Sequence, residues 1–313
     1  MQIVSFNDYV PGVVKGNRTV DISRAVEHIV GPAPPMQKMP ALVARFKEVE
    51  ESVRELVEST TGDVALADVQ LRVPTGRPGK MLFGVGNYLE GLDPFNEPVD
   101  LFLKSPSSIL DPGGTVVLPP NDTQLFFHEA EFGVVIGEYA RNVSAAEAND
   151  YIFGYIGVID VSARIGPVGG IQNKSFDTFC PLGPCITTAD EMHDVSDVRI
   201  RLWVNDILHQ DYSTSDMHHK IPELIEFGSS VMTLEPGDVI ACGTNHSGLG
   251  PIQHGDTVTL EVDGVGSFSV TVSDDRRRRW PHGPDPAVGD RVRQYHLTGN
   301  MPLDSMFSVH PLP

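Results

Sequence analysis

The stretch FHEAEFGVVI at residues 127–136 sets two acidic side chains at the start of an apolar, β-branched run. The run predicts a buried strand, and Glu129 and Glu131 stand two positions apart on it. Side chains at positions i and i+2 of a strand share one face, so the two carboxylates project side by side. Such a pair is costly unless it faces solvent, one member holds a proton, or a cation lies between the two.

A third acid follows on the next apolar run. Residues 151–160 read YIFGYIGVID and predict a second buried strand that ends at Asp160. The two glutamates alone would also fit an ordinary half-exposed edge strand, whereas a third carboxylate at a strand end favours a metal site. Oxygen-only ligands favour Mg²⁺, Mn²⁺ or Ca²⁺ over zinc. The sequence therefore predicts a divalent-cation site formed by Glu129, Glu131 and Asp160.

The acidic net charge limits the kinds of binding partner that we expect. The 313 residues carry 23 Lys and Arg against 42 Asp and Glu, a formal net charge of -19. Non-specific binding to nucleic acid or to an anionic membrane needs positive surface, so neither partner is expected. One basic run, Arg276 to Arg279, follows Asp274 and Asp275, and it predicts a solvated arm or a subunit contact.

Cysteine use and the N-terminus predict a cytoplasmic protein. The N-terminal MQIVSFNDYV lacks a basic segment followed by an apolar one, and no stretch approaches the apolar length of a membrane helix. The cysteines show neither metal-site spacing nor a disulfide framework, which fits a reducing compartment; they are Cys180, Cys185 and Cys242.

Three parts are predicted along the chain. Residues 1–72 form a small α/β lobe, in which two short strands precede a helix with apolar residues at three- and four-residue steps: Leu42, Phe46, Val49, Val53 and Leu56. The segment RVPTGRPGK reads as a linker into a larger domain at residues 73–275, where short strands dominate, and residues 276–313 form a C-terminal extension. The predicted fold class is α+β, predominantly β.

Local patterns predict three further elements. Alternating apolar residues on both sides of DGVGS, residues 263–267, predict a hairpin. A capping box at Ser144 and Glu147 predicts a helix start. A second helix is expected around Pro222.

From about residue 81 to 272 the chain resembles the fumarylacetoacetate hydrolase family. Eight segments carry the resemblance in the expected order: the Asn87-Tyr88 pair, LFLKSPSS, HEAEFGVVIG, GYIGVIDVSAR, NKSFDTFCPLGP, VNDILHQ, STSDM, and LEPGDVIACGT followed by GLG. The resemblance implies a mixed β-roll or sandwich with a small N-terminal α/β lobe, which agrees with the fold class predicted above. It also implies a homodimer that acts on a small keto or diketo acid.

The resemblance implies roles for individual residues. The three predicted metal ligands fall on carboxylates that bind a divalent cation in the family, usually Mg²⁺. Lys174, in NKSFDTF, falls on the lysine that binds the oxygen-rich end of the substrate, where a fixed positive charge stabilises oxygen as it becomes anionic. The other substrate-binding residues that it implies are Tyr88, Arg164 and Thr244.

The sequence departs from the family where the water-activating base is expected. Hydrolase and decarboxylase members usually place a histidine on a lid a few residues after the Asn-Tyr pair, and here that position is Gly91, with Glu90 before it. His246, in the loop after Thr244, can exchange a proton near neutral pH and is one candidate base, although it can also merely support the loop. Glu90 is the second candidate, with a surface acid on an open lid as its alternative.

We expect a divalent-metal-dependent hydrolase of C–C bonds in β-diketo or α-keto acids, similar to acylpyruvate hydrolases. The alternative within the family is an isomerase, tautomerase, decarboxylase or hydratase of an α-keto acid, as in members similar to 2-hydroxyhepta-2,4-diene-1,7-dioate isomerase. The missing lid histidine strengthens this alternative, because a proton transfer through an enolate needs no positioned water. A second alternative is a non-catalytic keto-acid-binding protein.

Overall fold

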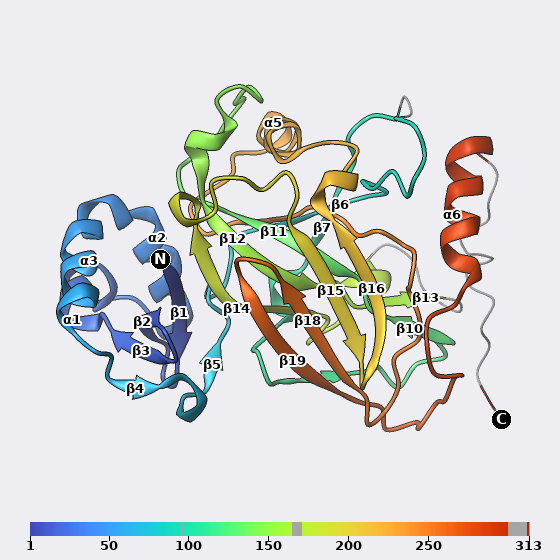
Figure 1. Ribbon diagram of the computed structural model, residues 1–313, viewed down its shortest axis with the longest axis horizontal. Helices are drawn as coiled ribbons and strands as arrows, with labels where there is room; N and C mark the ends of the chain where they lie inside the picture. Colours follow the sequence, from blue (N-terminus) through green and yellow to red (C-terminus); the bar gives the residue numbers. More distant parts are fainter. Residues whose placement is uncertain (95–96, 165–170, 300–311, 313) are drawn as a thin grey trace.

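Two β-sheets pack face to face in the body of the molecule, and a small lobe with three helices lies beside them (Figure 1). The computed structural model describes residues 1–94, 97–164, 171–299 and 312. Within these residues strands dominate the body and helices are few and short. The predicted α+β, predominantly β fold with a small N-terminal lobe is confirmed.

The larger sheet runs from the N-terminal lobe into the body. Its strand order is β4-β3-β2-β1-β14-β12-β11-β17-β6-β7, with β5 paired to β1 and β8 paired to β14. The strands are β1 (Gln2–Phe6), β2 (Val10–Lys15), β3 (Arg18–Asp21), β4 (Val64–Ala65), β5 (Leu71–Arg72), β6 (Met81–Gly84), β7 (Leu101–Lys104), β8 (Ile109–Leu110), β11 (Ala130–Ile136), β12 (Ile152–Ile159), β14 (Cys180–Thr188) and β17 (Val239–Ala241).

A second sheet covers the larger one, in the order β16-β15-β18-β19-β9. Its strands are β9 (Thr115–Val117), β15 (Arg199–Val204), β16 (Ile207–Ser213), β18 (Thr257–Val262) and β19 (Gly266–Ser273), and β10 (Leu125–Phe127) pairs separately with β13 (Ser162–Arg164). In β18 every second residue is buried, as expected for a sheet with one face on the core. Every residue of β11 is buried, because both faces of that strand are covered. The predicted hairpin is β18–β19.

Helix prediction succeeded in part. The lobe contains α1 (Ser23–Val30), and the single helix predicted through residues 42–56 is instead α2 (Lys38–Ala44) and α3 (Glu50–Ser59), separated by a 3-10 turn at Phe46–Glu48. The apolar period survives this break because both helices face the same core cluster. The helix near Pro222 is α5 (Ile221–Val231), whereas the predicted helix start at Ser144 leads only to a 3-10 turn, Ala148–Tyr151.

The remaining helices are α4 (Ile171–Lys174) and α6 (Ala287–Thr298), with further 3-10 turns at Pro35–Gln37, Leu66–Asp68, Pro106–Ser108, Ala189–Glu191 and Thr214–Asp216. In Figure 1, α6 lies at the end of the molecule opposite to the N-terminal lobe. The division into residues 1–72, 73–275 and 276–313 stays a prediction, as does the homodimer.

Within the basic run before α6, Arg276 and Arg278 bond to other residues of the chain, whereas Arg277 and Arg279 are exposed. Arg278 is largely buried, donates to the carbonyl oxygens of Pro119, Asn121 and Thr123, and pairs with Asp274 at 2.8 Å. The prediction of a solvated arm or subunit contact is therefore wrong for Arg278, which fastens the start of the extension to the body.

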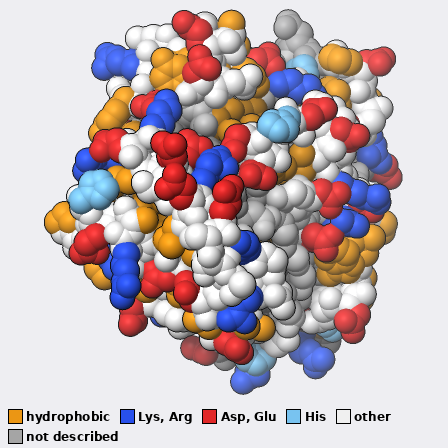
Figure 2. Space-filling model, turned by 60° about the vertical axis from the view of Figure 1, so that its left-hand side comes forward, with side chains coloured by type: hydrophobic (Ala, Val, Ile, Leu, Met, Phe, Trp, Pro, Cys, Tyr) orange, Lys and Arg blue, Asp and Glu red, His pale blue; other side chains and the backbone are white. Residues whose placement is uncertain are grey.

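One face of the molecule shows how its charged side chains are distributed. On the face shown in Figure 2, Asp and Glu side chains lie between the Lys and Arg side chains, and the basic ones do not gather into one patch. Among the described residues, no helix has the length and apolar character needed to cross a bilayer.

Candidate active site

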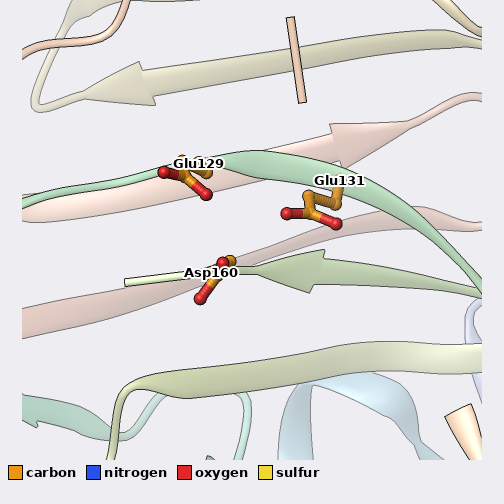
Figure 3. A group of neighbouring side chains, drawn as sticks. All are labelled: Glu129, Glu131 and Asp160. Carbon is orange, nitrogen blue, oxygen red and sulfur yellow. The ribbon is translucent and has the colours of Figure 1, made fainter. Parts of the chain in front are cut away.

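Three carboxylates converge where β11 begins and β12 ends (Figure 3). The two strands pair antiparallel with Ala130 opposite Ile159, and the Asp160 N–H donates to the Glu129 carbonyl oxygen at 2.8 Å. This register brings one carboxylate oxygen from each of Glu129, Glu131 and Asp160 within 4.8 Å of the others. All three side chains are buried. The sequence argument for neighbouring carboxylates thus agrees with the geometry.

Burial and mutual repulsion disturb these acids unequally. Desolvation, reinforced by Asp160 and Glu129, raises the pKa of Glu131 well above its ordinary value. Desolvation also raises the pKa of Asp160, although Lys104 and Lys174 oppose it. For Glu129 the desolvation is outweighed by Lys174 and Arg164, so its pKa falls. A group of buried acids in which one strongly resists ionisation is an arrangement that a bound cation would stabilise.

Two buried lysines partly neutralise the cluster. The Lys174 ammonium, at the end of α4, donates to Glu129 Oε2 and Asp160 Oδ2 at 2.6 Å each. Lys104, at the end of β7, donates to Asp160 Oδ1 and to the Phe179 carbonyl oxygen, the latter at 2.7 Å. The three carboxylates offer only oxygen donors, which hard divalent cations prefer, and a bound cation would favour the ionised form of Glu131. The residues present therefore fit a hard divalent cation held by the three carboxylates.

A glycine in the loop after β17 contacts the carboxylate of Glu131. The Gly243 N–H donates to Glu131 Oε2 at 2.8 Å. Gly243 has φ +85°, and a Cβ there would lie 3.2 Å from the Gly84 carbonyl oxygen. Glycine is needed because the backbone is left-handed and passes close to the neighbouring strand.

The cluster opens into a cavity of about 480 Å³, and its lining includes Glu129, Arg164, Lys174, Thr244 and His246. Most of the sequence-predicted site residues are therefore brought together. The Arg164 guanidinium lies 5.8 Å from the centre of the Phe127 ring and has no hydrogen-bond partner among the described residues, so it is free to bind an anion.

Tyr88 is placed differently. It is buried beside the site, packs edge-to-face on Tyr212 with ring centres 4.9 Å apart, and does not belong to the described cavity lining. Its predicted contact with substrate stays a prediction.

The two candidate bases, Glu90 and His246, form a pair. Glu90 Oε1 accepts from the His246 backbone N–H at 2.8 Å and lies 2.5 Å from His246 Nδ1. Glu90 is buried, so it is not a surface acid on an open lid. With Nδ1–H donating to the carboxylate, Nε2 is left as the available ring nitrogen on the residue that lines the cavity. Desolvation lowers the pKa of His246, but the neighbouring Glu90 carboxylate outweighs it and the net pKa is raised.

Sequence reasoning missed two buried side chains behind the site. Lys104 stands in the LFLKSPSS motif, and a lysine at the end of an apolar strand was the available signal. Gln210 donates through its amide to Thr244 Oγ1 at 2.8 Å and accepts from the Ala130 N–H at 2.9 Å. His128 is buried, and its Nδ1 is hydrogen-bonded to Oε1 of this same glutamine at 3.1 Å. Gln210 thus connects the strand of the carboxylates to the loop of His246.

The fold and site point to a class of metal-binding enzymes built on this sandwich, and comparison identifies it. Residues 87–273 match the family described as fumarylacetoacetate (FAA) hydrolase C-terminal. That match covers more than half of the chain, so the protein belongs to the fumarylacetoacetate hydrolase family and is an enzyme.

Two relatives cover almost nine tenths of the chain, and a third covers about two thirds of it. A maleylpyruvate hydrolase of Aquipseudomonas alcaligenes is 32% identical over 288 residues, which cover 87% of this chain and 99% of the relative. A crystal structure of maleylpyruvate hydrolase from Sphingobium sp. SYK-6 in complex with manganese(II) and pyruvate is 34% identical with TM-score 0.79, covering 88% of this chain and 99% of that one. An oxaloacetate tautomerase of Bacillus subtilis is 34% identical over 222 residues, covering 66% and 73%.

Proposed function

We propose that the protein is a divalent-metal-dependent hydrolase that cleaves a C–C bond in a β-diketo or α-keto acid of the acylpyruvate type. The observation that carries this proposal is the His246–Glu90 pair beside the cavity of the carboxylate cluster. A histidine whose Nδ1–H is held by a carboxylate is arranged to take a proton at Nε2, as a hydrolase requires for its water. The base that seemed to be missing is thus supplied by two segments distant in the sequence.

The predicted cation, Mg²⁺ with Mn²⁺ or Ca²⁺ as alternatives, would be held by Glu129, Glu131 and Asp160. It would supply Lewis-acid polarisation of the keto acid's oxygens. Support comes from the convergence of three buried carboxylates and from the manganese and pyruvate in the related Sphingobium structure.

Each residue at the cavity then has a role. Arg164 binds the substrate carboxylate, and Lys174 holds positive charge beside the oxygen that becomes anionic. His246 takes a proton from water, whose oxygen attacks the carbonyl carbon farther from the carboxylate. The bond from that carbon to the methylene breaks, and its electron pair enters the pyruvate enolate. His246 then delivers the proton that it took from water to the methylene carbon, which completes pyruvate. The other product is the free carboxylic acid.

Pyruvate release and isotope incorporation test this reaction. The purified protein with Mn²⁺ is given acetylpyruvate or maleylpyruvate in H₂¹⁸O, and we expect pyruvate together with ¹⁸O in the carboxylate of the second product. His246→Ala should lower kcat by about 10²- to 10⁴-fold, the range of general acid–base catalysis. A lack of pyruvate from either substrate would refute the hydrolase, and an unchanged kcat in His246→Ala would refute its base.

The second candidate is a tautomerase or isomerase of an α-keto acid, because the oxaloacetate tautomerase is 34% identical to this chain, although over a shorter stretch than the maleylpyruvate hydrolase at 32%. The same imidazole can move a proton between an enol oxygen and the adjacent carbon without any water. Catalysed enol–keto exchange of oxaloacetate without pyruvate release from acylpyruvates would favour this candidate. Metal-dependent binding of the keto acid with no turnover of any kind would favour the non-catalytic alternative.

A further inference from the structure

The turn that carries Glu90 is in a conformation that glutamate rarely adopts. Glu90 has φ +55°, the left-handed region, in which a Cβ crowds the backbone. Such a residue persists only where its surroundings hold it, and these residues cluster at functional sites. The contacts that hold Glu90 therefore matter for the Glu90–His246 pair.

Asp216, in the 3-10 turn Thr214–Asp216, makes those contacts. Its carbonyl oxygen accepts from the Leu89 N–H at 2.9 Å, and its carboxylate oxygen Oδ2 accepts from the Glu90 N–H at 3.1 Å. The same Oδ2 accepts from the side-chain amide of Asn245 at 2.8 Å. Asn245 directly precedes His246, so one carboxylate oxygen is bonded to the segments of both members of the pair.

The neighbouring contacts show why Asp216 is the point of attachment. Asn87 is bonded to the backbone of the 218–219 segment and of Cys242, which fixes the base of the turn but not Glu90 itself. On the other side, Asn245 Oδ1 accepts from the Ser247 N–H at 2.9 Å, which orients its amide toward Asp216. We call Asp216 with the Glu90 N–H and the Asn245 amide the Asp216 junction.

We infer that Asp216 is a positioning residue for the reaction: the Asp216 junction keeps Glu90 in its left-handed conformation and holds it against His246. This inference rests on the proposed function of the pair. Without the carboxylate, Glu90 can relax to an ordinary backbone conformation and the loop of Asn245 loses its side-chain anchor, so the pair separates. The metal ligands, Lys174 and Arg164 make no contact with Asp216, and they should be unaffected.

Four variants test the inference. Asp216→Ala removes both carboxylate bonds, whereas Asp216→Asn keeps an amide oxygen that can accept both. Asn245→Asp sets two carboxylates against each other. Adding Asp216→Asn removes the charge repulsion and keeps an amide oxygen for the Glu90 N–H, but it does not restore the bond to residue 245, because the oxygen that accepts from Glu90 cannot also donate. Asp211→Ala is the matched control, because Asp211 is a nearby aspartate whose side chain pairs only with the surface residue Arg199.

We expect Asp216→Ala to lower kcat by about 10- to 100-fold with KM changed less than about 2-fold, since a misplaced catalytic group mainly costs rate. Asp216→Asn should stay within about 3-fold of the parent, and it should recover part of the rate lost in Asn245→Asp, because the charge repulsion is removed and the Glu90 N–H keeps an acceptor. Mn²⁺ affinity should be the same in all variants. Hydrogen–deuterium exchange without substrate should show faster exchange of peptides covering residues 87–92 in Asp216→Ala and Asn245→Asp only.

An unchanged kcat in Asp216→Ala, or a loss of melting temperature with kcat intact, would overturn the inference, because both describe a merely structural residue. If Asp216→Ala does not fold, Asn245→Asp with and without Asp216→Asn decides: an unchanged kcat in Asn245→Asp, or no recovery of the lost rate when Asp216→Asn is added, also overturns the inference. Should the parent protein release no pyruvate, the proposed function fails, while the exchange experiment still tests the Asp216 junction on its own.

Discussion

Replacing Glu90 by Gln tests the effect of the negative charge of Glu90, because glutamine has nearly the same shape and no charge. The substitution keeps an oxygen that can accept from His246 Nδ1, but it removes the negative charge that now lies 2.5 Å from that nitrogen. Glu90 is the main influence that raises the pKa of His246, while burial and Lys174 lower it. Without the charge the lowering influences remain, so the pKa of His246 should fall.

The size of the shift follows from the geometry. Two unit charges 4 Å apart interact by about 4 kcal/mol at an effective dielectric of about 20. The His246 side chain is 15% exposed, so solvent screens part of this energy, and the loss of the remainder lowers the pKa of His246. We also expect kcat to fall about 10- to 100-fold, because the neutral amide no longer stabilises the imidazolium that forms.

The sign of the pH effect is fixed by the role of His246. A general base must be neutral, so kcat/KM rises with pH through the pKa of His246 in the free enzyme and is level above it. In Glu90→Gln this rising limb should move to lower pH. The assay is pyruvate release at saturating Mn²⁺ from pH 5 to 9, with the exposed Glu147→Gln as control for the loss of one charge. If the rising part of the kcat/KM–pH profile stays in place or moves to higher pH, the pairing of Glu90 with His246 is refuted.

Three further predictions concern metal binding and stability. Glu129→Ala should weaken Mn²⁺ binding on the order of 100-fold or more in calorimetry, since a lost ligand costs at least as much as a lost outer contact; retained affinity would exclude the proposed metal site. Lys104→Met should lower the free energy of unfolding in urea and EDTA by about 1.5–3 kcal/mol, because it removes one of the two ammonium groups paired with the buried Asp160, whereas the exposed Lys47→Met should change little. Arg278→Met should cost about 2–4 kcal/mol through its lost carbonyl bonds and buried pair, and the more exposed Arg276→Met should cost less; equal losses would contradict the anchoring role.

The metal ligands could be predicted from sequence because their arrangement is mostly local. Glu129 and Glu131 share a face through the period of a strand, and Asp160 ends the next apolar run. Strands that follow one another in sequence are usually neighbours in the sheet, and β11 and β12 do pair. Lys104 escaped the same reasoning, because nothing local indicates that its ammonium reaches Asp160 across the sheet.

The Glu90–His246 pair could not be predicted by spacing. The two residues are 156 positions apart in turns, where neither helical nor strand periodicity indicates which side chains meet. Each was named separately as a candidate base, and each had a plausible passive alternative. Only the tertiary structure, which packs the turn after β6 against the loop after β17, makes them partners. The helix predicted through residues 42–56 failed for a different reason, since the buried period is the same whether the helix is continuous or broken.

The metal ligands lie at strand ends, whereas the Glu90–His246 pair lies in turns. This difference affects which reaction the site can catalyse. The carboxylates lie where β11, which is buried throughout, pairs with the buried end of β12, so replacing them disturbs the core as well as the cation. Glu90 and His246 lie in turns at the edge of the cavity, where a change alters proton transfer and leaves the sheet intact. Enolate stabilisation is needed for hydrolysis, decarboxylation and tautomerisation alike, whereas the placement of a base and a water distinguishes them. The reaction should therefore be changeable by substitutions in these two turns without loss of metal binding.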